Sequence, residues 1–293
     1  MSTAHDIDKL KRLFGQHVPE LADKRFARLR DAGTDNVIYR IGEKHLLRVA
    51  SRPEAIASLA YREPVAMRCL KNLPIETPQL LANGLMDTAE SWPWLICTWL
   101  EGESFEASHH APTKKDARRL ALFLLDLQGQ KRDFAAAPNV DNHWRGCQLS
   151  QRDTATRSAI GEVAEEFDAI ALAAIWKAAL EAGPCADRDQ TWIHGDLHPG
   201  NLLVRGGEVA GVIDWGLSGL GDPACDLIAG FSLFDAAERE AFWQAVGVAE
   251  TVWQRARGWA LSTSVIAYAH YRGTRTPIEA RSRRLLDELS FNV

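Results

Sequence analysis

The chain lacks the features that would place it in a membrane or outside the cell. Its longest apolar runs, Leu120–Leu125 and Val209–Ile213, are far shorter than the roughly 20 residues that a membrane-spanning helix requires. Residues 1–14 are polar and of mixed charge, without the apolar stretch of a signal peptide. The five cysteines are odd in number, widely spaced and form no C-x-x-C pair. They indicate reduced thiols rather than a disulfide or zinc framework, so we expect a cytoplasmic protein with no membrane partner.

The chain also lacks an excess of basic residues. Its 34 lysines and arginines are outnumbered by 39 acidic residues, for a net charge of −5. This balance argues against a nucleic-acid partner, which would require a basic surface. The one basic run, Arg281–Arg284, falls in a helical pattern and is predicted to be a solvated face. No internal repeat is visible, and 293 residues with 46% hydrophobic content suffice for a core without disulfides.

The first third of the chain combines strand patterns with short helical ones. Residues 36–41 and 45–49 predict two strands joined by a turn at 42–44. Residues 92–100 form a strongly apolar strand pattern, the second of another strand pair, before a turn at 101–103. Helical patterns are predicted at 21–30 and at 55–70, the latter interrupted by Pro64.

The rest of the chain is mainly helical. Residues 113–128 open with Thr113 and Asp116 at capping-box spacing, followed by apolar residues on one helix face. Further helical patterns cover 154–180, 236–246, 252–271 and 277–289. The predicted fold class is therefore α+β, with a small sheet-rich lobe at 1–100, a hinge near 98–102 and a larger helical lobe at 101–293.

One island of strands and loops, residues 191–226, interrupts the helical part. Residues 202–204 and 209–213 predict two short strands, which Gly206-Gly207 joins in a tight hairpin. This hairpin places Asp196 and Asn201 before its first strand and Asp214 after its second.

Phosphoryl transfer from ATP calls for this set of groups. It needs a carboxylate that orients the attacking hydroxyl and accepts its proton, together with hard oxygen ligands for Mg²⁺. Asp196 and Asn201 have the D-x-x-x-x-N spacing of a kinase catalytic loop, and Asp214-Trp215-Gly216 stands where kinases have D-F-G. The spacing predicts Asp196 as the catalytic base and Asn201 and Asp214 as magnesium ligands.

The strings His194-Gly-Asp-Leu-His-Pro-Gly-Asn201, Val212-Ile-Asp-Trp-Gly216 and Gly221-Asp-Pro-Ala-Cys-Asp226 resemble the aminoglycoside phosphotransferase family. The resemblance implies a two-lobed, protein-kinase-like fold and transfer of the γ-phosphate of ATP or GTP to a small-molecule hydroxyl. The expected acceptor is an aminoglycoside-type antibiotic. The alternatives are another small acceptor, such as a macrolide, choline or homoserine. Antibiotic resistance of the host does not follow from the family alone.

The resemblance also assigns residues outside the island. Arg48 lies where the family usually has a phosphate-contacting lysine, and Glu63 resembles the glutamate that pairs with this cation. Asp226 resembles a carboxylate that braces the catalytic loop. The loop before the first predicted strand lacks a G-x-G-x-x-G pattern but resembles the family's nucleotide-covering loop. The remaining expected nucleotide contacts are Thr34, Asp35 and Asn36 in that loop, and the hinge backbone at Cys97–Leu100, including Trp99.

Two other functions fit parts of the sequence, and several of the residues also have a purely structural explanation. A pseudokinase-like binding module would be expected to have lost metal ligands, and the sequence keeps them. A zinc hydrolase would use His194, His198 and Asp214, but Gly195 and the following Pro199-Gly200 disfavour the helix that such a histidine pair needs. Asp222 is either a helix cap or a group near the acceptor, and packing is the expected role of Trp92, Trp94 and Trp99.

The sequence does not determine which residues line the acceptor pocket. A polycationic acceptor calls for carboxylates, whereas the aromatic and basic segment 142–146 suits a neutral or anionic acceptor as well. Oligomeric state is not predicted. The candidate acceptor carboxylates of the helical lobe are Asp141, Asp153, Glu162, Glu165, Glu166 and Asp168.

Overall fold

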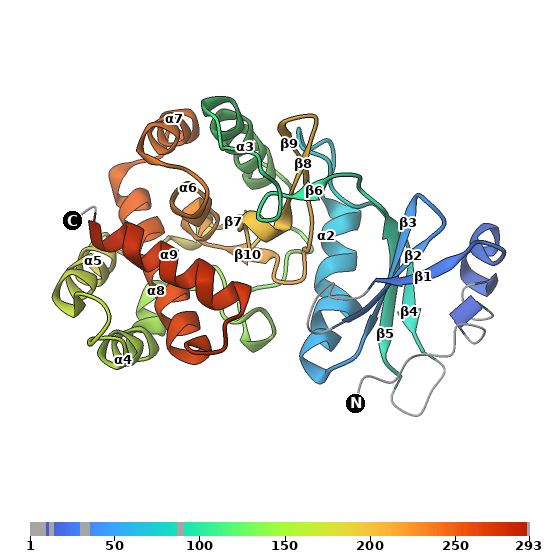
Figure 1. Ribbon diagram of the computed structural model, residues 1–293, viewed down its shortest axis with the longest axis horizontal. Coiled ribbons are helices and arrows are strands. Elements are labelled where there is room, and N and C mark those ends of the chain that lie inside the picture. Colours follow the sequence, from blue (N-terminus) through green and yellow to red (C-terminus); the bar gives the residue numbers. More distant parts are fainter. Residues whose placement is uncertain (1–9, 12–14, 30–35, 87–90, 292–293) are drawn as a thin grey trace.

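The computed structural model describes residues 10–11, 15–29, 36–86 and 91–291, and it has two lobes (Figure 1). One lobe is a five-stranded antiparallel sheet in the order β1-β2-β3-β5-β4. The other lobe is mostly helical, and helix α2 lies between the sheet and that lobe. The predicted α+β two-lobed architecture is confirmed. The strands are β1 (Phe26–Leu29), β2 (Asn36–Ile41), β3 (His45–Ala50), β4 (Leu80–Leu85) and β5 (Pro93–Thr98).

The sheet forms because both of its faces bury apolar side chains. One face packs with Leu10, Val18 and Leu21, and the other packs on the helical segments that follow β3. The predicted hairpin of β2 and β3 is confirmed. The predicted helix at 21–30 is wrong over its described residues, because β1 pairs with β2 from Phe26 opposite Ile41 to Leu29 opposite Ile38. Strand pairing here outweighs local helix propensity.

The helical pattern at 55–70 is built from three short pieces. A 3₁₀ turn (Pro53–Ala55) and a π-helical stretch (Ser58–Arg62) precede α2 (Glu63–Cys69). Pro64 occupies the first turn of α2, where its missing N–H is tolerated. The wider π turn ends at Glu63, so this buried carboxylate lies at the junction of the two helical geometries.

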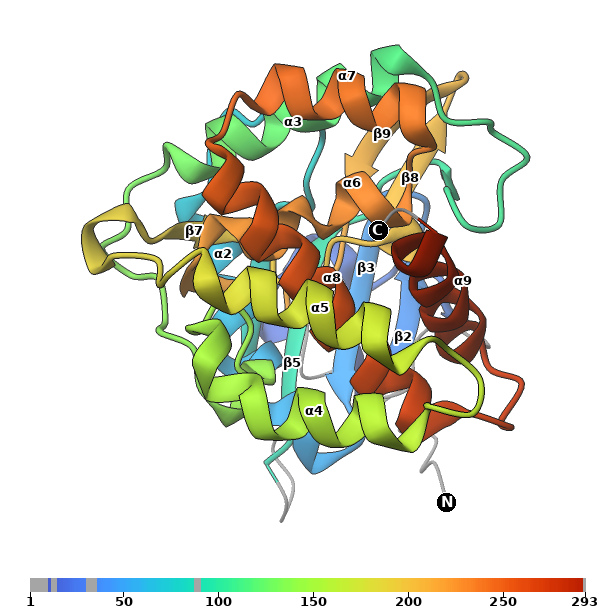
Figure 2. The same cartoon turned by 90° about the vertical axis from the view of Figure 1, so that its left-hand side faces the viewer.

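The helical lobe packs around α8. Figure 2 shows α4, α5 and α9 arranged about it, with the sheet lobe behind them. The capping box predicted for α3 is confirmed, because Thr113 and Asp116 exchange side-chain and backbone hydrogen bonds. The single pattern at 154–180 is two helices, since Asp168 caps a new one at Ala169. The helices are α3 (Lys114–Gln128), α4 (Asp153–Glu162), α5 (Ala169–Glu181), α6 (Ala229–Ser232), α7 (Ala236–Val246), α8 (Glu250–Tyr271) and α9 (Pro277–Phe291).

Two small ribbons fix the island, most of which is buried, within the helical lobe. β6 (Glu103–Ser104), β8 (Leu202–Arg205) and β9 (Glu208–Val212) form one, and β7 (Thr191–Ile193) pairs with β10 (Gly219–Gly221) in the other. The predicted hairpin turn between β8 and β9 is confirmed. Gly206 and Gly207 have φ of +63° and +77°, a geometry that favours glycine at both positions.

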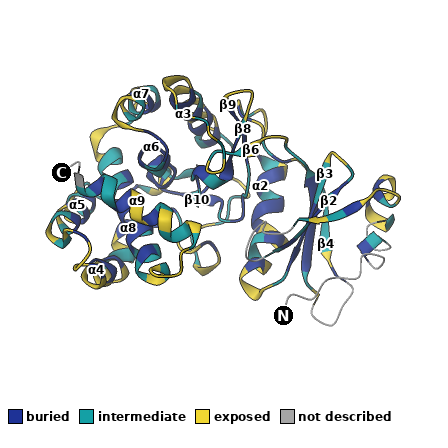
Figure 3. Cartoon of the chain, viewed as in Figure 1, coloured by how far each residue is buried: buried dark blue, intermediate teal, exposed yellow. Residues whose placement is uncertain are grey.

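Buried residues are concentrated in the interior of each of the two lobes (Figure 3). The central elements of the helical lobe are largely buried, while α4, α5 and α7 turn exposed faces outward. Across the described part of the chain, no helix combines the length and apolarity that a membrane span requires. All five cysteines are unpaired, as predicted.

Candidate active site

The segment between β7 and β8 is a loop tied down at its start by a buried carboxylate. Asp226 accepts hydrogen bonds from the backbone N–H groups of His194 (2.6 Å) and Gly195 (2.8 Å). Burial raises the pKa of Asp226 above its ordinary value, although both N–H donors oppose this shift. Gly195 has φ of +82°, and a β-carbon there would lie 2.5 Å from the Leu217 carbonyl oxygen. Asp226 therefore braces the loop, as the resemblance implies.

His194 serves the loop as an internal connector. Its Nε2 lies 3.0 Å from the carbonyl oxygen of Ile213, and its Nδ1 accepts the N–H of Asp196 at 3.2 Å. A carbonyl can only accept, so Nε2 carries the proton and the ring is neutral. Burial lowers the pKa of His194, in agreement with this tautomer. Both ring nitrogens are thus engaged, which excludes the zinc site predicted as an alternative at His194, His198 and Asp214.

Asp196 is the carboxylate of this loop, and its pKa is strongly lowered. Its Oδ1 lies 3.6 Å from Arg145 Nη2, and its Oδ2 lies 3.6 Å from His198 Nε2. Burial by itself would raise the pKa of Asp196, but its hydrogen-bonding interaction with His198 and the charge of Arg145 lower that pKa well below its usual range. The side chain is 31% exposed, so it is an ionised carboxylate that an incoming molecule can reach.

Asn201 and Asp214 are brought beside Asp196 by the β8–β9 hairpin. Asn201 Nδ2 donates to the backbone oxygen of Asp196 at 2.9 Å and to its Oδ2 at 3.3 Å. The N–H of Ile213 donates to the carbonyl of Asn201 at 3.0 Å, which places Asp214 next to Asn201. Asp214 has φ of +66° and a side chain that is 46% exposed. The structure therefore brings together the three side chains that the spacing singled out.

Arg48 connects the sheet lobe to the loop cluster, which consists of Asp196, Asn201 and Asp214. Its Nη1 lies 2.5 Å from Glu63 Oε1, and its Nη2 lies 3.5 Å from Asp214 Oδ1. Burial opposes the charge of Arg48, but Glu63 and Asp214 outweigh it and raise the pKa of Arg48 further. Burial raises the pKa of Glu63 to about 7, against the opposing effect of Arg48 and of an N–H from Trp215. The predicted pairing of Arg48 with Glu63 is present.

The predicted nucleotide contacts of the sheet lobe are described in part. Thr34 and Asp35 lie outside the described residues. Asn36 begins β2, and its buried Oδ1 has no hydrogen-bond partner among the residues that the structure describes. Cys97 is buried in the cluster between the sheet and α2, and burial raises the pKa of its thiol to about 12. The thiol of Cys97 is therefore not available to a ligand.

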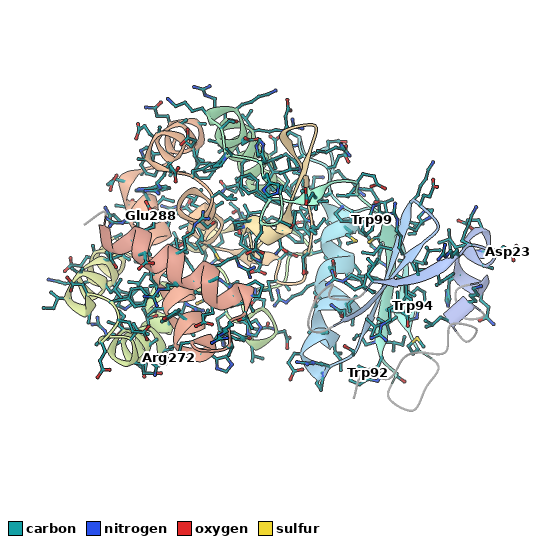
Figure 4. All side chains as sticks on the ribbon, in the orientation of Figure 1. Asp23, Trp92, Trp94, Trp99, Arg272 and Glu288 are labelled. Atoms are coloured by element: carbon teal, nitrogen blue, oxygen red, sulfur yellow. The ribbon has the colours of Figure 1, made fainter. Side chains whose placement is uncertain are left out.

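The hinge donors are partly committed within the protein. The N–H of Thr98 donates to the Gln79 carbonyl at 3.0 Å, and the N–H of Trp99 donates to the Lys44 carbonyl at 2.7 Å. The Arg40 guanidinium covers the Trp99 ring at 4.6 Å. Figure 4 shows Trp99 at the end of the sheet lobe that faces the helices, away from Trp92. A nucleotide base at this hinge must use backbone groups other than these two N–H groups.

Asp222 and most of the candidate acceptor carboxylates have partners of their own. Asp222 is buried, caps the turn at Ala224 and forms an ion pair with Arg255 at 2.7 Å, so it acts as a cap and not as an acceptor contact. Five of the six candidates lie in α4 or between α4 and α5, at the end of the molecule away from the sheet (Figure 1). Five of the six have local partners: Asp141 with Asn139, Asp153 with Arg157 and Trp176, Glu162 with Ser158, Glu166 with Tyr268, and Asp168 with its own helix.

Sequence reasoning missed two arginines, one that reaches Asp196 and one that joins the two lobes. Arg145 reaches Asp196 from the segment after α3, and the segment 142–146 was noted only for its composition. Arg62 is buried and donates to the carbonyl of Ser218 at 2.9 Å and to Asn139 Oδ1 at 2.7 Å, joining the π-helical stretch to the helical lobe. A spacing pattern carries no signal for either contact, because the partners are 51 to 156 residues away.

The oxygen donors of the cluster fit magnesium better than zinc. Mg²⁺ prefers one or two carboxylate or amide oxygens and completes its shell with water and phosphate oxygens. Asp214 and Asn201 offer that set. Within the described residues, no group of three or more His, Cys, Asp or Glu side chains is arranged to hold a metal. A magnesium ion held by Asp214 and Asn201 would keep its remaining coordination positions for water and phosphate oxygens.

The arrangement of a twisted sheet, a bridging Arg–Glu pair and a braced Asp–Asn loop defines a protein-kinase-like fold. The profile of the phosphotransferase enzyme family matches residues 27–259, so the chain belongs to this family and is a phosphotransferase. No curated protein matches the chain significantly.

Several solved structures share the fold across nearly the whole chain. An aminoglycoside phosphotransferase in complex with GDP and kanamycin is 14% identical with a TM-score of 0.66, over 97% of this chain and 98% of that one. A macrolide 2'-phosphotransferase from Brachybacterium faecium is 20% identical with a TM-score of 0.62, over 97% of both chains. A spectinomycin phosphotransferase with ADP and spectinomycin is 14% identical with a TM-score of 0.63, over 97% of both chains.

Proposed function

We propose that the chain transfers the γ-phosphoryl group of ATP or GTP to a hydroxyl of a small molecule, with Asp196 as the catalytic base. The observation that supports this most is the convergence of Asp196, Asn201 and Asp214 at one ribbon, with Arg48 reaching Asp214. Asp196 is ionised and exposed enough to receive the proton of an acceptor hydroxyl.

The nucleotide would lie between the two lobes. Asn201 and Asp214 would hold Mg²⁺, which neutralises charge on the phosphates when it is bound. Arg48, oriented by Glu63, would contact the phosphates with its guanidinium. The loop of Thr34, Asp35 and Asn36 would cover the phosphates, and the backbone at Cys97–Leu100, including Trp99, would contact the base. A nucleotide of this kind is a cytoplasmic substrate, in keeping with the expected location.

The acceptor predicted from the sequence is an aminoglycoside-type antibiotic. The structurally similar enzymes support an acceptor of that size, since by their names they act on or bind kanamycin, a macrolide and spectinomycin. Another small hydroxyl compound, such as choline or homoserine, is the alternative. The charges around Asp196 bear on this choice.

The test is acceptor-dependent ADP or GDP release by the purified chain with magnesium, comparing Asp196→Asn with the parent. We expect the substitution to lower kcat about a hundredfold or more, because it removes a positioned base. Asp187→Asn is the matched control. It makes the same chemical change at an exposed residue of the helical lobe and is expected to leave the rate unchanged.

Calorimetry with magnesium and ATP separates catalysis from mere binding. Nucleotide binding without transfer to any acceptor would favour the pseudokinase-like module over the enzyme. Retention of most of the activity in Asp196→Asn would show that another group is the base.

A further inference from the structure

The segment that carries Arg145 is held against the loop cluster in a strained conformation. His143 and Trp144 have φ of +50° and +57°, a left-handed backbone that non-glycine residues rarely adopt. The buried Asn142 imposes it, because its Nδ2 donates to the carbonyls of Arg145 (3.2 Å) and Leu217 (3.3 Å). Consecutive residues of this kind persist only where their surroundings require them, and they are concentrated at functional sites. The position of Arg145 is therefore imposed by tertiary contacts.

Arg145 stands at the place where an acceptor must approach. Its Nη2 is 3.6 Å from Asp196 Oδ1, too far for a direct hydrogen bond but close enough to share a bound group. A β-carbon on Gly195 would touch the Arg145 β-carbon at 3.4 Å, so the two segments are packed together. A hydroxyl that gives its proton to Asp196 comes within hydrogen-bond distance of this carboxylate. The atoms next to that hydroxyl must then lie beside the Arg145 guanidinium.

A second cation lies behind Arg145. Arg152 donates to Ser262 Oγ at 2.8 Å and to the His143 carbonyl at 3.1 Å, and it lies over the Trp259 ring at 5.1 Å. All of these partners are neutral, and no carboxylate of the described residues lies within salt-bridge distance of Arg152. Burial, reinforced by the charge of Arg145, lowers the pKa of Arg152 to about 10. Arg152 thus adds a second guanidinium next to Arg145, and of the two only Arg145 lies within salt-bridge distance of Asp196.

The acidic group on another side of the loop is already neutralised. Glu106 lies beside Gly200, and Arg281 binds both of its oxygens at 3.0 and 2.9 Å. Arg281 belongs to the run predicted to be a solvated face. Arg283 and Arg284 of that run are exposed, whereas Arg281 is only partly so. Glu106 therefore offers no unpaired carboxylate to an acceptor, and the positive charge on the Arg145 side of Asp196 comes from Arg145 and the neighbouring Arg152.

We propose that the acceptor carries an anionic group, a carboxylate or a phosphate, next to its reactive hydroxyl, and that Arg145 binds this group with Arg152 behind it. The inference rests on the proposed function, since it concerns the acceptor of the same site. A guanidinium suits this task because its planar fork matches a carboxylate or phosphate with two parallel hydrogen bonds. A polycationic acceptor would instead meet the like charge of Arg145 beside Asp196.

The experiment compares acceptors that differ only in charge. Gluconate, sorbitol and glucamine share one polyol skeleton and present a carboxylate, a neutral hydroxyl and an ammonium group. Glycerol phosphate against glycerol separates a phosphate preference from a carboxylate preference, and kanamycin represents the polycationic class. Binding to the magnesium–nucleotide complex is measured by calorimetry, and transfer is measured by ADP release. We expect gluconate or glycerol phosphate to exceed its neutral partner, and gluconate to exceed glucamine, by about tenfold or more in kcat/KM.

Variants then assign the preference to Arg145. Arg145→Gln should reduce the ratio of anionic to cationic acceptor by about tenfold or more, through KM rather than kcat, and Arg145→Lys should restore part of it. Arg157→Gln removes an exposed arginine of α4 that pairs with Asp153, and it should leave the ratio unchanged. A merely structural role of Arg145 would lower all acceptors alike, so an unchanged ratio overturns the proposal.

The remaining outcomes separate the two proposals. Equal binding of all compounds, no binding of the anions, or a preference for glucamine or kanamycin in the parent chain also overturns the anionic acceptor. In the last outcome, calorimetry shows a preference for the anions that is lost in Arg145→Gln while no compound accepts phosphate. That result would support the anion site and refute the proposed function.

Discussion

Asp226 allows a quantitative prediction because its two oxygens serve different donors. In Asp226→Asn one oxygen becomes an NH₂ group, which then faces a backbone N–H of His194 or Gly195. Each buried donor left without an acceptor costs about 1–3 kcal/mol, and the loss of a desolvated charge returns part of this. We expect a net loss of about 2–4 kcal/mol in the free energy of unfolding. At about 2–4 °C per kcal/mol, the melting temperature should fall by about 5–15 °C.

Asp168→Asn is the matched control for this prediction. Asp168 also accepts two backbone N–H groups, from Ile170 and Ala171, but both reach the same oxygen at 3.0 Å on an exposed helix end. Asparagine supplies that oxygen equally well, so the change should stay within about 0.5 kcal/mol. Urea unfolding and calorimetry measure both variants, with equal slopes against urea showing that two-state behaviour is kept. If Asp226→Asn unfolds within about 2 °C of Asp168→Asn, the bracing role assigned to Asp226 is incorrect.

Two further predictions concern Glu63, which pairs with Arg48, and Gly195, which lies in the loop between β7 and β8. Because the pKa of Glu63 is raised to about 7 in the folded protein, stability should fall as pH rises from about 4.5 to 7, by up to about 3 kcal/mol, relative to Glu63→Gln. Parallel urea midpoints of the two proteins at pH 5 and pH 8 would contradict this shift. Gly195→Ala should lower soluble yield and thermal stability, since its β-carbon meets the Leu217 carbonyl, whereas Gly161→Ala should not, because open space surrounds it. Equal melting temperatures would refute the steric argument.

Features set by a few neighbouring residues could be predicted from the sequence. The capping box of Thr113 and Asp116, the glycine pair at the β8–β9 turn and the alternation in β2 all follow from local preferences. The spacing of Asp196, Asn201 and Asp214 also determined that they would meet, because a two-residue hairpin leaves its flanking residues side by side.

Local preference failed where a distant partner decided the conformation. Residues 26–29 have no strong pattern of their own and became a strand because β2 offers them a pairing edge. The helical pattern at 154–180 continues through the position where Asp168 caps a new helix. In both places the competing local states differ by little, so tertiary contacts select between them.

The chemistry of the loop was encoded by residue types at short spacing, and its electrostatic surroundings were not. Arg48 meets Asp214 across 166 residues, and Arg145 meets Asp196 across 51. Such contacts depend on how the lobes and ribbons pack, which no local pattern records. The sequence by itself determined that Asp196, Asn201 and Asp214 would meet at one ribbon. Only the tertiary structure decided which cations surround it, because charge interactions depend on distance in space and not on separation along the chain.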